Sequence, residues 1–290
     1  MSRLLGFGYS IVILAYMMLP LQAHAAQTKR LLISPPRAYS SVDAGHEKIN
    51  TITVANTTNN PMQVTLSVQQ FSVNDYVYSQ VFSAVKQDWL HLGADSVQLA
   101  ANQSTDVQYT LTPPANVAPG GYYFSIFVST QVQKDGGTDT MQAANLLYVT
   151  INGALTKTSQ LKTSHMPRVV FGKTISYQFS VANTGNVHFF IYTQGTLSSL
   201  FTKQSGTSQT HILMPSTTRA VAGSIQSPLL PGLYHATYGY KTDSGTTVTR
   251  AQRIIYIPFW FIATIGVVAI ILVRLREKRR SKLSSEKIGK

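Results

Sequence analysis

The central part of the chain alternates between apolar and polar residues with a period of two. Clear examples are the segments 63–69, 106–111 and 175–181. Because successive side chains of a strand point to opposite faces, this alternation predicts strands with one buried and one solvated face. Turn-forming sequences separate the predicted strands: Asn59-Asn60-Pro61, Pro119-Gly120-Gly121, Asp135-Gly136-Gly137, Thr184-Gly185-Asn186, Pro231-Gly232 and Asp243-Ser244-Gly245. Many short strands with such turns indicate an antiparallel sandwich or barrel.

Two short sequences recur in the same order in each half of this region. Val54-Ala55-Asn56-Thr57 returns as Val181-Ala182-Asn183-Thr184, and Pro119-Gly120-Gly121-Tyr122 returns as Pro231-Gly232-Leu233-Tyr234. A Ser/Thr-containing turn precedes another strand in both halves. The repetition predicts two sandwiches of one topology, joined by a polar stretch that is either a linker or an entering strand.

Apolar segments at both ends predict export and membrane anchoring. Residues 1–25 have the basic start, apolar stretch and small-residue cleavage pattern of a signal peptide, with an uncleaved anchor as the alternative. Ile254 to Val273 has no charged side chain and is long enough to span a bilayer as a helix. The predicted fold is therefore all-β: a sandwich at 27–155, a second at 160–253, a transmembrane helix at 254–273 and a tail at 274–290.

The basic residues bear on topology more than on ligand choice. The net charge is +13, yet eight of the 24 Lys and Arg residues lie in the tail, Arg274 to Lys290. Such residues stay in the cytoplasm and meet anionic inner-leaflet lipids, which predicts a single-pass protein of the cell membrane with an extracellular ectodomain. The other basic residues form no run, which argues against nucleic acid. The chain has no cysteine, so the exported domains are held by core burial without disulfides.

No catalytic or cofactor motif stands out in the sequence. There is no zinc-protease, nucleophile-elbow or phosphate-loop pattern, and the histidines lack metal-ligand spacing. Asp135 to Asp139 contains two carboxylates, fewer oxygen ligands than calcium needs, and is best explained as a hairpin turn. We therefore expect no enzyme activity, no metal and no cofactor.

The segment 71–92 is the strongest binding candidate because aromatic rings lie beside hydrogen-bonding side chains there. Rings with such neighbours suit sugar faces or a protein hot spot. The predicted ligand-binding residues are Asn74, Asp75, Tyr76, Tyr78 and Trp89. The alternative is structural: Trp89 then completes the sandwich core and the tyrosines cover its edge.

The order of motifs resembles a known family. Ile33-Ser34-Pro35-Pro36, the Val54 to Thr57 turn, Trp89-Leu90 and Ala118 to Tyr123 resemble the N-terminal domain of the WxL-interacting protein family, and Asn183 to His188 with Leu230 to Tyr234 is similar to an envelope immunoglobulin-like domain. The resemblance implies two immunoglobulin-like domains, a transmembrane helix and a basic tail. It also implies that the first domain binds peptidoglycan and the second a partner protein.

These features lead to three hypotheses of function. The first is a membrane-anchored extracellular binding or scaffold protein of the bacterial envelope, which contacts cell-wall glycan or another surface protein. The second is a chaperone-like assembly factor for surface appendage subunits; an exposed edge strand with alternating apolar residues beside a basic interdomain cleft would favour it. The third is an accessory subunit of a membrane complex, with the helix as its working part.

Overall fold

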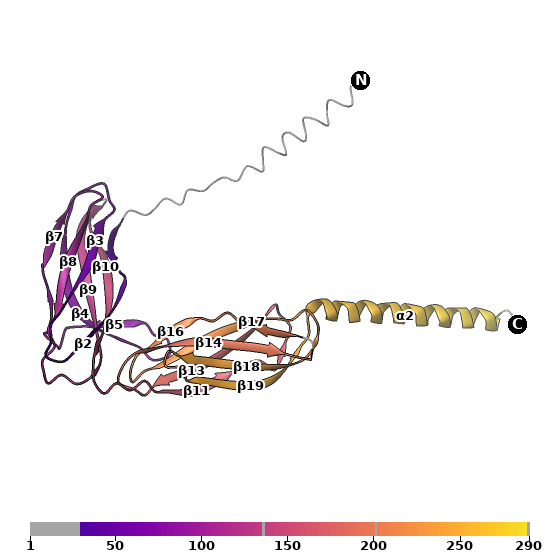
Figure 1. The fold of residues 1–290 in the computed structure, drawn as a ribbon. Helices are drawn as coiled ribbons and strands as arrows, with labels where there is room; N and C mark the ends of the chain where they lie inside the picture. Colours follow the sequence, from indigo (N-terminus) through magenta and orange to yellow (C-terminus); the bar gives the residue numbers. More distant parts are fainter. Residues whose placement is uncertain (1–29, 135–136, 201, 289–290) are drawn as a thin grey trace, which may run out of the picture.

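The protein consists of two β-sandwiches followed by one long helix (Figure 1). The computed structural model describes residues 30–134, 137–200 and 202–288. The predicted signal peptide, residues 1–25, lies outside the described residues. The two sandwiches meet at an angle, and the helix leaves the end of the second sandwich that is farther from the first.

Two sheets that pack face to face form the first sandwich. One sheet has the order β1-β3-β8-β6, and the other has the order β2-β10-β9-β4-β5 with β7 beside β4. The strands are β1 (Leu31–Ser34), β2 (Arg37–Val42), β3 (Lys48–Asn56), β4 (Met62–Val73), β5 (Gln80–Ser83), β6 (Leu90–Leu92), β7 (Ser96–Leu99), β8 (Ser104–Leu111), β9 (Gly120–Lys134) and β10 (Gly137–Ile151).

The second sandwich repeats this plan with shorter strands. Its sheets have the orders β11-β13-β17 and β12-β19-β18-β14-β15, with β16 beside β14. The strands are β11 (Ser159–His165), β12 (Val169–Val170), β13 (Thr174–Asn183), β14 (Phe189–Ser198), β15 (Lys203–Ser205), β16 (Thr210–Leu213), β17 (Thr218–Gln226), β18 (Gly232–Thr242) and β19 (Thr247–Tyr256).

The topology of each sandwich is immunoglobulin-like, as the sequence predicts. In each sandwich the first strand pairs in one sheet: β1 with β3, and β11 with β13. The chain then crosses to the other sheet, where a short strand runs parallel to the last strand: β2 beside β10, and β12 beside β19. The predicted alternation is confirmed. Apolar residues such as Val107, Tyr109 and Leu111 on β8 are buried, and their polar neighbours point outward.

The repeated asparagine makes equivalent hydrogen bonds in both sandwiches. Asn56 and Asn183 are each 1% exposed. The Asn56 amide donates to the carbonyl oxygens of Asn60 and Ala100 at 2.8 and 2.9 Å, and the Asn183 amide donates to those of Val187 and Leu213 at 3.0 and 3.1 Å. Each side-chain oxygen also accepts a backbone N–H two residues on. One buried side chain thus joins a turn to a neighbouring segment.

The repeated Pro-Gly-x-Tyr sequences form a second matched feature. The Tyr122 hydroxyl donates to the carbonyl oxygen of Ala118 at 3.1 Å, and the Tyr234 hydroxyl donates to that of Leu230 at 2.8 Å. In each case the tyrosine bonds four residues back across the turn. This is the tyrosine corner of immunoglobulin-like sandwiches, so the recurring sequence reports a shared fold.

The C-terminal helix begins later than the sequence predicts. Ile254 to Tyr256 continue strand β19, where Ile254 and Tyr256 are buried in the core of the second sandwich. The helix α2 (Phe259–Ile288) starts after Pro258 and continues through the basic tail. The prediction that the helix starts at Ile254 is therefore wrong, because an apolar core strand and an apolar helix are continuous in the sequence and hydropathy does not separate them.

We predict that Asn56→Ala and Asn183→Ala each destabilise the sandwich that contains them by about 2–4 kcal/mol, because each removes two hydrogen bonds to carbonyl oxygens and the acceptor of one backbone N–H. Chemical denaturation of the purified chain in detergent would measure the loss. Asn116→Ala, an exposed asparagine in a loop of the first sandwich, is the matched control. Equal effects of Asn116→Ala and the two buried substitutions would contradict the prediction.

Candidate functional site

The hairpin formed by β9 and β10 extends beyond its neighbours in the first sandwich. The two strands pair over their whole length. On one side, β4 pairs with β9 only as far as Ser129; on the other, β2 pairs with β10 only from Leu146 onward. Among the described residues no strand pairs with either edge of the outer half of the hairpin, although the N–H of Leu31 in β1 donates to the Sδ of Met141 at 3.0 Å. Unpaired edges of this kind can accept another strand.

Backbone geometry identifies the open groups on β10. The N–H of Leu146 donates to the carbonyl oxygen of Pro36, so the even-numbered residues of β10 face away from β9. The open edge is thus formed by Thr138, Thr140, Gln142 and Ala144. The N–H of Thr140 already donates to the Asp139 carboxylate at 2.9 Å. The freer donors of this edge are therefore the N–H groups of Gln142 and Ala144, at the end nearer β2.

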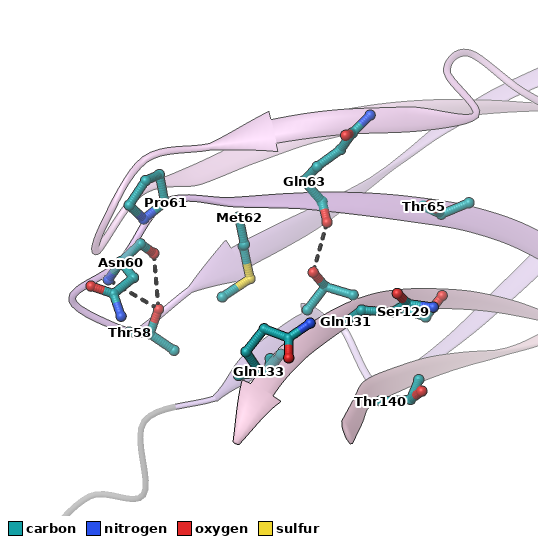
Figure 2. Close-up of a pocket in the computed structure, with 12 residues that line it drawn as sticks. Thr58, Asn60, Pro61, Met62, Gln63, Thr65, Ser129, Gln131, Gln133 and Thr140 are labelled. Carbon is teal, nitrogen blue, oxygen red and sulfur yellow. Dashed lines mark hydrogen bonds between the residues drawn. The ribbon is translucent and has the colours of Figure 1, made fainter. Parts of the chain in front are cut away.

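A polar notch lies on the opposite side of the hairpin, where β4 and β9 diverge (Figure 2). The Thr130 hydroxyl donates to the carbonyl oxygen of Gln63 at 2.7 Å, in place of a ladder bond. Pro61 has no N–H and could not continue the ladder. The notch has a volume of about 790 Å³. It is lined by Thr58, Asn60, Pro61, Met62, Gln63, Thr65, Ser129, Thr130, Gln131, Val132, Gln133 and Thr140.

A more apolar cleft lies where the open edge of β10 reaches β2. Its volume is about 530 Å³, and it is lined by Pro36, Arg37, Gln80, Phe82, Ala144 and Leu146. Phe82 forms one wall and packs edge-on against Phe127, with ring centroids 4.9 Å apart. The Arg37 side chain is exposed and makes no hydrogen bond or ion pair with any described residue. The cleft therefore combines an apolar wall with an available positive charge.

A second guanidinium adds to the positive field near this cleft. Arg219 of the second sandwich stacks over the Tyr78 ring at 4.5 Å and donates to the carbonyl oxygen of Ile212. Burial lowers the pKa of Arg219, Tyr78 and Tyr148 oppose this shift, and the positive charge of Arg37 adds the smallest lowering. Arg37 and Arg219 therefore both place positive charge near this junction, and Arg219 is already engaged by the Tyr78 ring and the Ile212 carbonyl.

The residues predicted to bind ligand lie in two different places. Asp75 and Tyr76 contact the second sandwich: the N–H of Thr218 donates to the Asp75 carboxylate at 2.7 Å, and the N–H of Tyr76 donates to the Thr218 carbonyl at 2.6 Å. The N–H of Ala220 in turn donates to the carbonyl oxygen of Tyr76. The loop between β4 and β5 therefore adds a short bridge to the edge of β17.

Tyr78 is the most buried part of this contact, at 8% exposed. Its hydroxyl accepts the N–H of Met214 at 2.7 Å and lies 2.6 Å from the Thr217 hydroxyl. Tyr76 and Tyr78 both have left-handed backbone conformations, with φ of 63° and 62°. Such conformations are costly for bulky residues, so the bonds to the second sandwich hold the loop in a strained shape.

Trp89 and Asn74 make contacts within the first sandwich. Trp89 is 3% exposed and packs edge-on against Tyr122 and Phe124 in the core, which agrees with the structural alternative for this residue. The Asn74 amide donates to the Ser79 hydroxyl and closes its own loop. The ligand-binding role of the five residues remains a prediction. Four of them lie in the loop between β4 and β5, which contacts the second sandwich.

Two of the predicted turns, Pro119-Gly120-Gly121 and Thr184-Gly185-Asn186, meet where the two sandwiches are in contact. Asn186 donates through its amide to the carbonyl oxygens of Pro119 and Ala154, and its side-chain oxygen accepts the N–H of Thr156. Its own carbonyl oxygen accepts the N–H of Gly121 at 2.9 Å. One asparagine therefore bonds to the first sandwich and to the linker at the same time.

An aromatic cluster fills the space between these contacts. His188 of the second sandwich lies against Tyr39, Tyr123 and Tyr148, with ring centroids 5.3 to 6.0 Å away. Tyr148 also meets Phe71 edge-on at 5.4 Å. Burial lowers the pKa of His188 to about 4, Lys157 lowers it further, and Asp243 opposes the shift. The imidazole is therefore neutral in the folded protein near neutral pH.

Sequence reasoning missed Arg37 and the open edge of β10. Nothing in the local sequence separates Arg37 from other exposed arginines. The long alternating runs on both sides of Asp135-Gly136-Gly137 do indicate a long hairpin, but not which neighbours end early. Within the described residues there is no group of three or more His, Asp or Glu side chains that could hold a metal.

Comparison with known proteins gives no family for the chain. No protein-family model and no curated protein matches it. Similar solved structures include a chaperone–tip adhesin complex of CFA/I fimbriae biogenesis (10% identity, 79% of this chain and 99% of that one, TM-score 0.43) and the class 5 fimbriae chaperone CfaA (11%, 79% and 100%, 0.42). Another is the Salmonella enterica SafA pilin with the SafB chaperone (13%, 80% and 98%, 0.40).

We predict that Tyr78→Phe weakens the junction by about 1–3 kcal/mol, because the buried N–H of Met214 loses its acceptor. Thermal unfolding and hydrogen exchange at the Met214 amide would measure this loss. Tyr76→Phe is the matched control, since that side chain is 55% exposed and its contacts to β17 are made by the backbone. Unchanged exchange at Met214 in Tyr78→Phe would contradict the assigned role.

The pKa of His188 predicts an acid-sensitive junction. Between pH 6.5 and about 4 the unfolded chain binds a proton on this residue that the folded chain does not. The contribution of the neutral His188 ring to the free energy of unfolding is therefore fully present above pH 6.5. Up to about 3 kcal/mol of it is lost as the pH falls toward 4. The difference in unfolding free energy between wild type and His188→Phe, measured across this range, isolates the effect. His165→Gln, which removes an exposed histidine, is the control; parallel profiles for wild type and His188→Phe would refute the prediction.

Proposed function

We propose that the chain is a membrane-tethered binding protein of the bacterial envelope, and that its first sandwich holds an extended segment of another surface protein. The observation that carries the proposal is the open edge of β10 from Gly137 to Asn145, beyond the start of β2. An extended peptide that adds to such an edge gains main-chain hydrogen bonds, and neighbouring pockets select its side chains.

The cleft beside Arg37 makes the two ends of this edge chemically different. Ala144 and Leu146 lie on the outer face of β10, where they line the apolar cleft with Phe82. Beyond them toward the hairpin tip, the same face carries Gln142, Thr140 and Thr138, so the apolar alternation is confined to the cleft end. A partner segment with apolar side chains at one end and a carboxylate near Arg37 fits this arrangement best.

The tether is the helix α2 and its basic continuation. Residues Phe259–Lys278 have a mean hydropathy of 2.0 and are long and apolar enough to cross a membrane. The basic residues from Arg274 onward favour a cytoplasmic C-terminus and contact with anionic inner-leaflet lipids. Under this proposal both sandwiches are extracellular, and the chain binds its partner without a catalytic step.

The same site accommodates the chaperone-like hypothesis. A chaperone-like assembly factor would hold the partner's segment on β10 and later release it to another subunit, whereas a scaffold would retain it. Both use one edge and one cleft. The WxL-interacting resemblance remains compatible with either, because it concerns the order of domains and turns.

A second candidate function is glycan binding at the notch of Figure 2. Its lining is formed mostly of uncharged hydroxyl and amide side chains, which suit the hydroxyl groups of a sugar. Retention of the chain by isolated cell-wall sacculi, and its loss in Gln131→Ala/Gln133→Ala, would support this role. The β10 variants described next should leave such retention unchanged.

We predict that Gln142→Pro lowers partner binding at least tenfold. The N–H of Gln142 faces away from β9, so proline removes the outward donor and leaves the ladder to β9 in place. The full chain in detergent would serve as bait for envelope proteins, with retained proteins quantified by mass spectrometry. Gln142→Ala is the matched control, because it keeps the N–H. Equal retention by wild type and Gln142→Pro would overturn strand addition at this edge.

A further inference from the structure

One end of the second sandwich exposes an unusual number of leucines. Leu200 is 94% exposed, Leu229 85%, Leu230 58% and Leu233 60%. Leu200 lies on the turn after β14, Leu229 and Leu230 lie on the connection from β17 to β18, and Leu233 lies at the start of β18. Leu200, Leu230 and Leu233 line one shallow hollow with Pro231. Exposed leucines gathered at one place indicate a contact surface, since single exposed leucines are ordinary but clusters are not.

This end is also the one from which α2 departs (Figure 1). Leu233 pairs with Ile255 near the end of β19, and only Ile257 and Pro258 separate that strand from the helix. The N–H of Ile257 donates to the carbonyl oxygen of Val170 at 2.9 Å, so the short connection is itself bonded to the sandwich. The leucines therefore stay close to the first turn of the helix.

An aromatic contact continues the surface onto the helix. The rings of Phe171 and Phe259 are stacked with centroids 6.4 Å apart. Trp260 follows and is 52% exposed. Aromatic rings favour the boundary between headgroups and acyl chains, so the start of α2 marks the level at which the leucines would meet lipid.

The charge of the second sandwich is complementary to an anionic membrane. Between Ser159 and Tyr256 there are eight Lys or Arg residues and one acidic residue, Asp243. That carboxylate pairs with Lys157 at 3.0 Å, at the opposite end of the sandwich. The leucine end carries exposed Lys173 and Lys203 and no carboxylate. Basic side chains around an apolar patch are typical of surfaces that bind lipid headgroups.

We propose that this end of the second sandwich docks on the outer leaflet of the membrane that α2 spans. Leu200, Leu229, Leu230 and Leu233 enter the boundary between headgroups and acyl chains, and Lys173 and Lys203 contact lipid phosphates. The inference rests on the proposed membrane tether. Docking fixes the second sandwich upright on the bilayer and so holds the open edge of β10 at a set height and orientation.

The absence of cysteine makes a direct test possible. The full chain would be reconstituted in vesicles of phosphatidylcholine with a minority of phosphatidylglycerol, with one fluorophore-labelled cysteine per variant and lipid-borne quenchers. We expect labels at Leu229→Cys and Leu200→Cys to be quenched several-fold more than a label at Ser244→Cys, an exposed position at the opposite end of the same sandwich.

A label at Ala269→Cys, in the middle of α2, separates the two proposals. If this label is not quenched by deep quenchers, the membrane tether itself is wrong. If Ala269→Cys is quenched while Leu229→Cys and Leu200→Cys match Ser244→Cys, the tether stands and the docking surface is refuted.

A charge substitution gives an independent readout. Leu229→Asp should lower the quenching of a label at Leu200→Cys at least twofold, because a carboxylate is expelled from anionic headgroups. Ile49→Asp, at an aliphatic residue of the first sandwich that is 58% exposed, is the matched control and should leave the quenching unchanged. Quenching that is insensitive to Leu229→Asp would overturn the proposal.

Discussion

The arrangement of the molecule depends on the loop between β4 and β5, which is held in place by the second sandwich. Tyr76 and Tyr78 adopt left-handed backbone conformations, which are unfavourable for residues with bulky side chains. The Tyr78 hydroxyl accepts the N–H of Met214 just after β16, and the Asp75 carboxylate accepts the N–H of Thr218 at the start of β17. Asn186 also ties the linker to both sandwiches. The loop conformation and the junction therefore stabilise each other, and neither is determined by the first sandwich alone.

This junction connects the helix α2, the proposed membrane tether, to the candidate binding edge. The helix α2 leaves the second sandwich through a connection of two residues, and the second sandwich is bonded to the first through Asp75, Tyr78 and Asn186. A rotation at the junction would expose the aromatic cluster around His188 to water, which costs roughly 25 cal/mol per Å² of apolar surface. The position of β10 relative to α2 is thus set by packing at the junction.

The sequence determines the fold more clearly than the site. Turn chemistry is local, so Asn56 and Asn183, or Tyr122 and Tyr234, can be recognised as equivalent from a few neighbouring letters, and the structure gives each pair the same bonds. The binding prediction for Asn74 to Tyr78 identified a loop tip correctly but had no means of finding its neighbour, which lies about 140 residues away in sequence. The helix start was missed because burial of Ile254 is a tertiary property.

The difference between the two sandwiches explains why the first is the better candidate for strand addition. β19 also has an open edge, since β12 covers only Ile255 and Tyr256. Arg250 and Arg253 lie on this strand, with Arg253 at the open edge, and charged residues on an edge strand are a common defence against unwanted pairing. The open edge of β10 from Gly137 to Asn145 has one charged residue, Asp139 near the hairpin tip, and none from Thr140 to Ala144. The outer edge of the neighbouring strand β9 is unpaired beyond Ser129 as well. One fold is present twice, but in the described parts of the chain only the first copy leaves an unpaired ribbon with an uncharged stretch beside an apolar cleft.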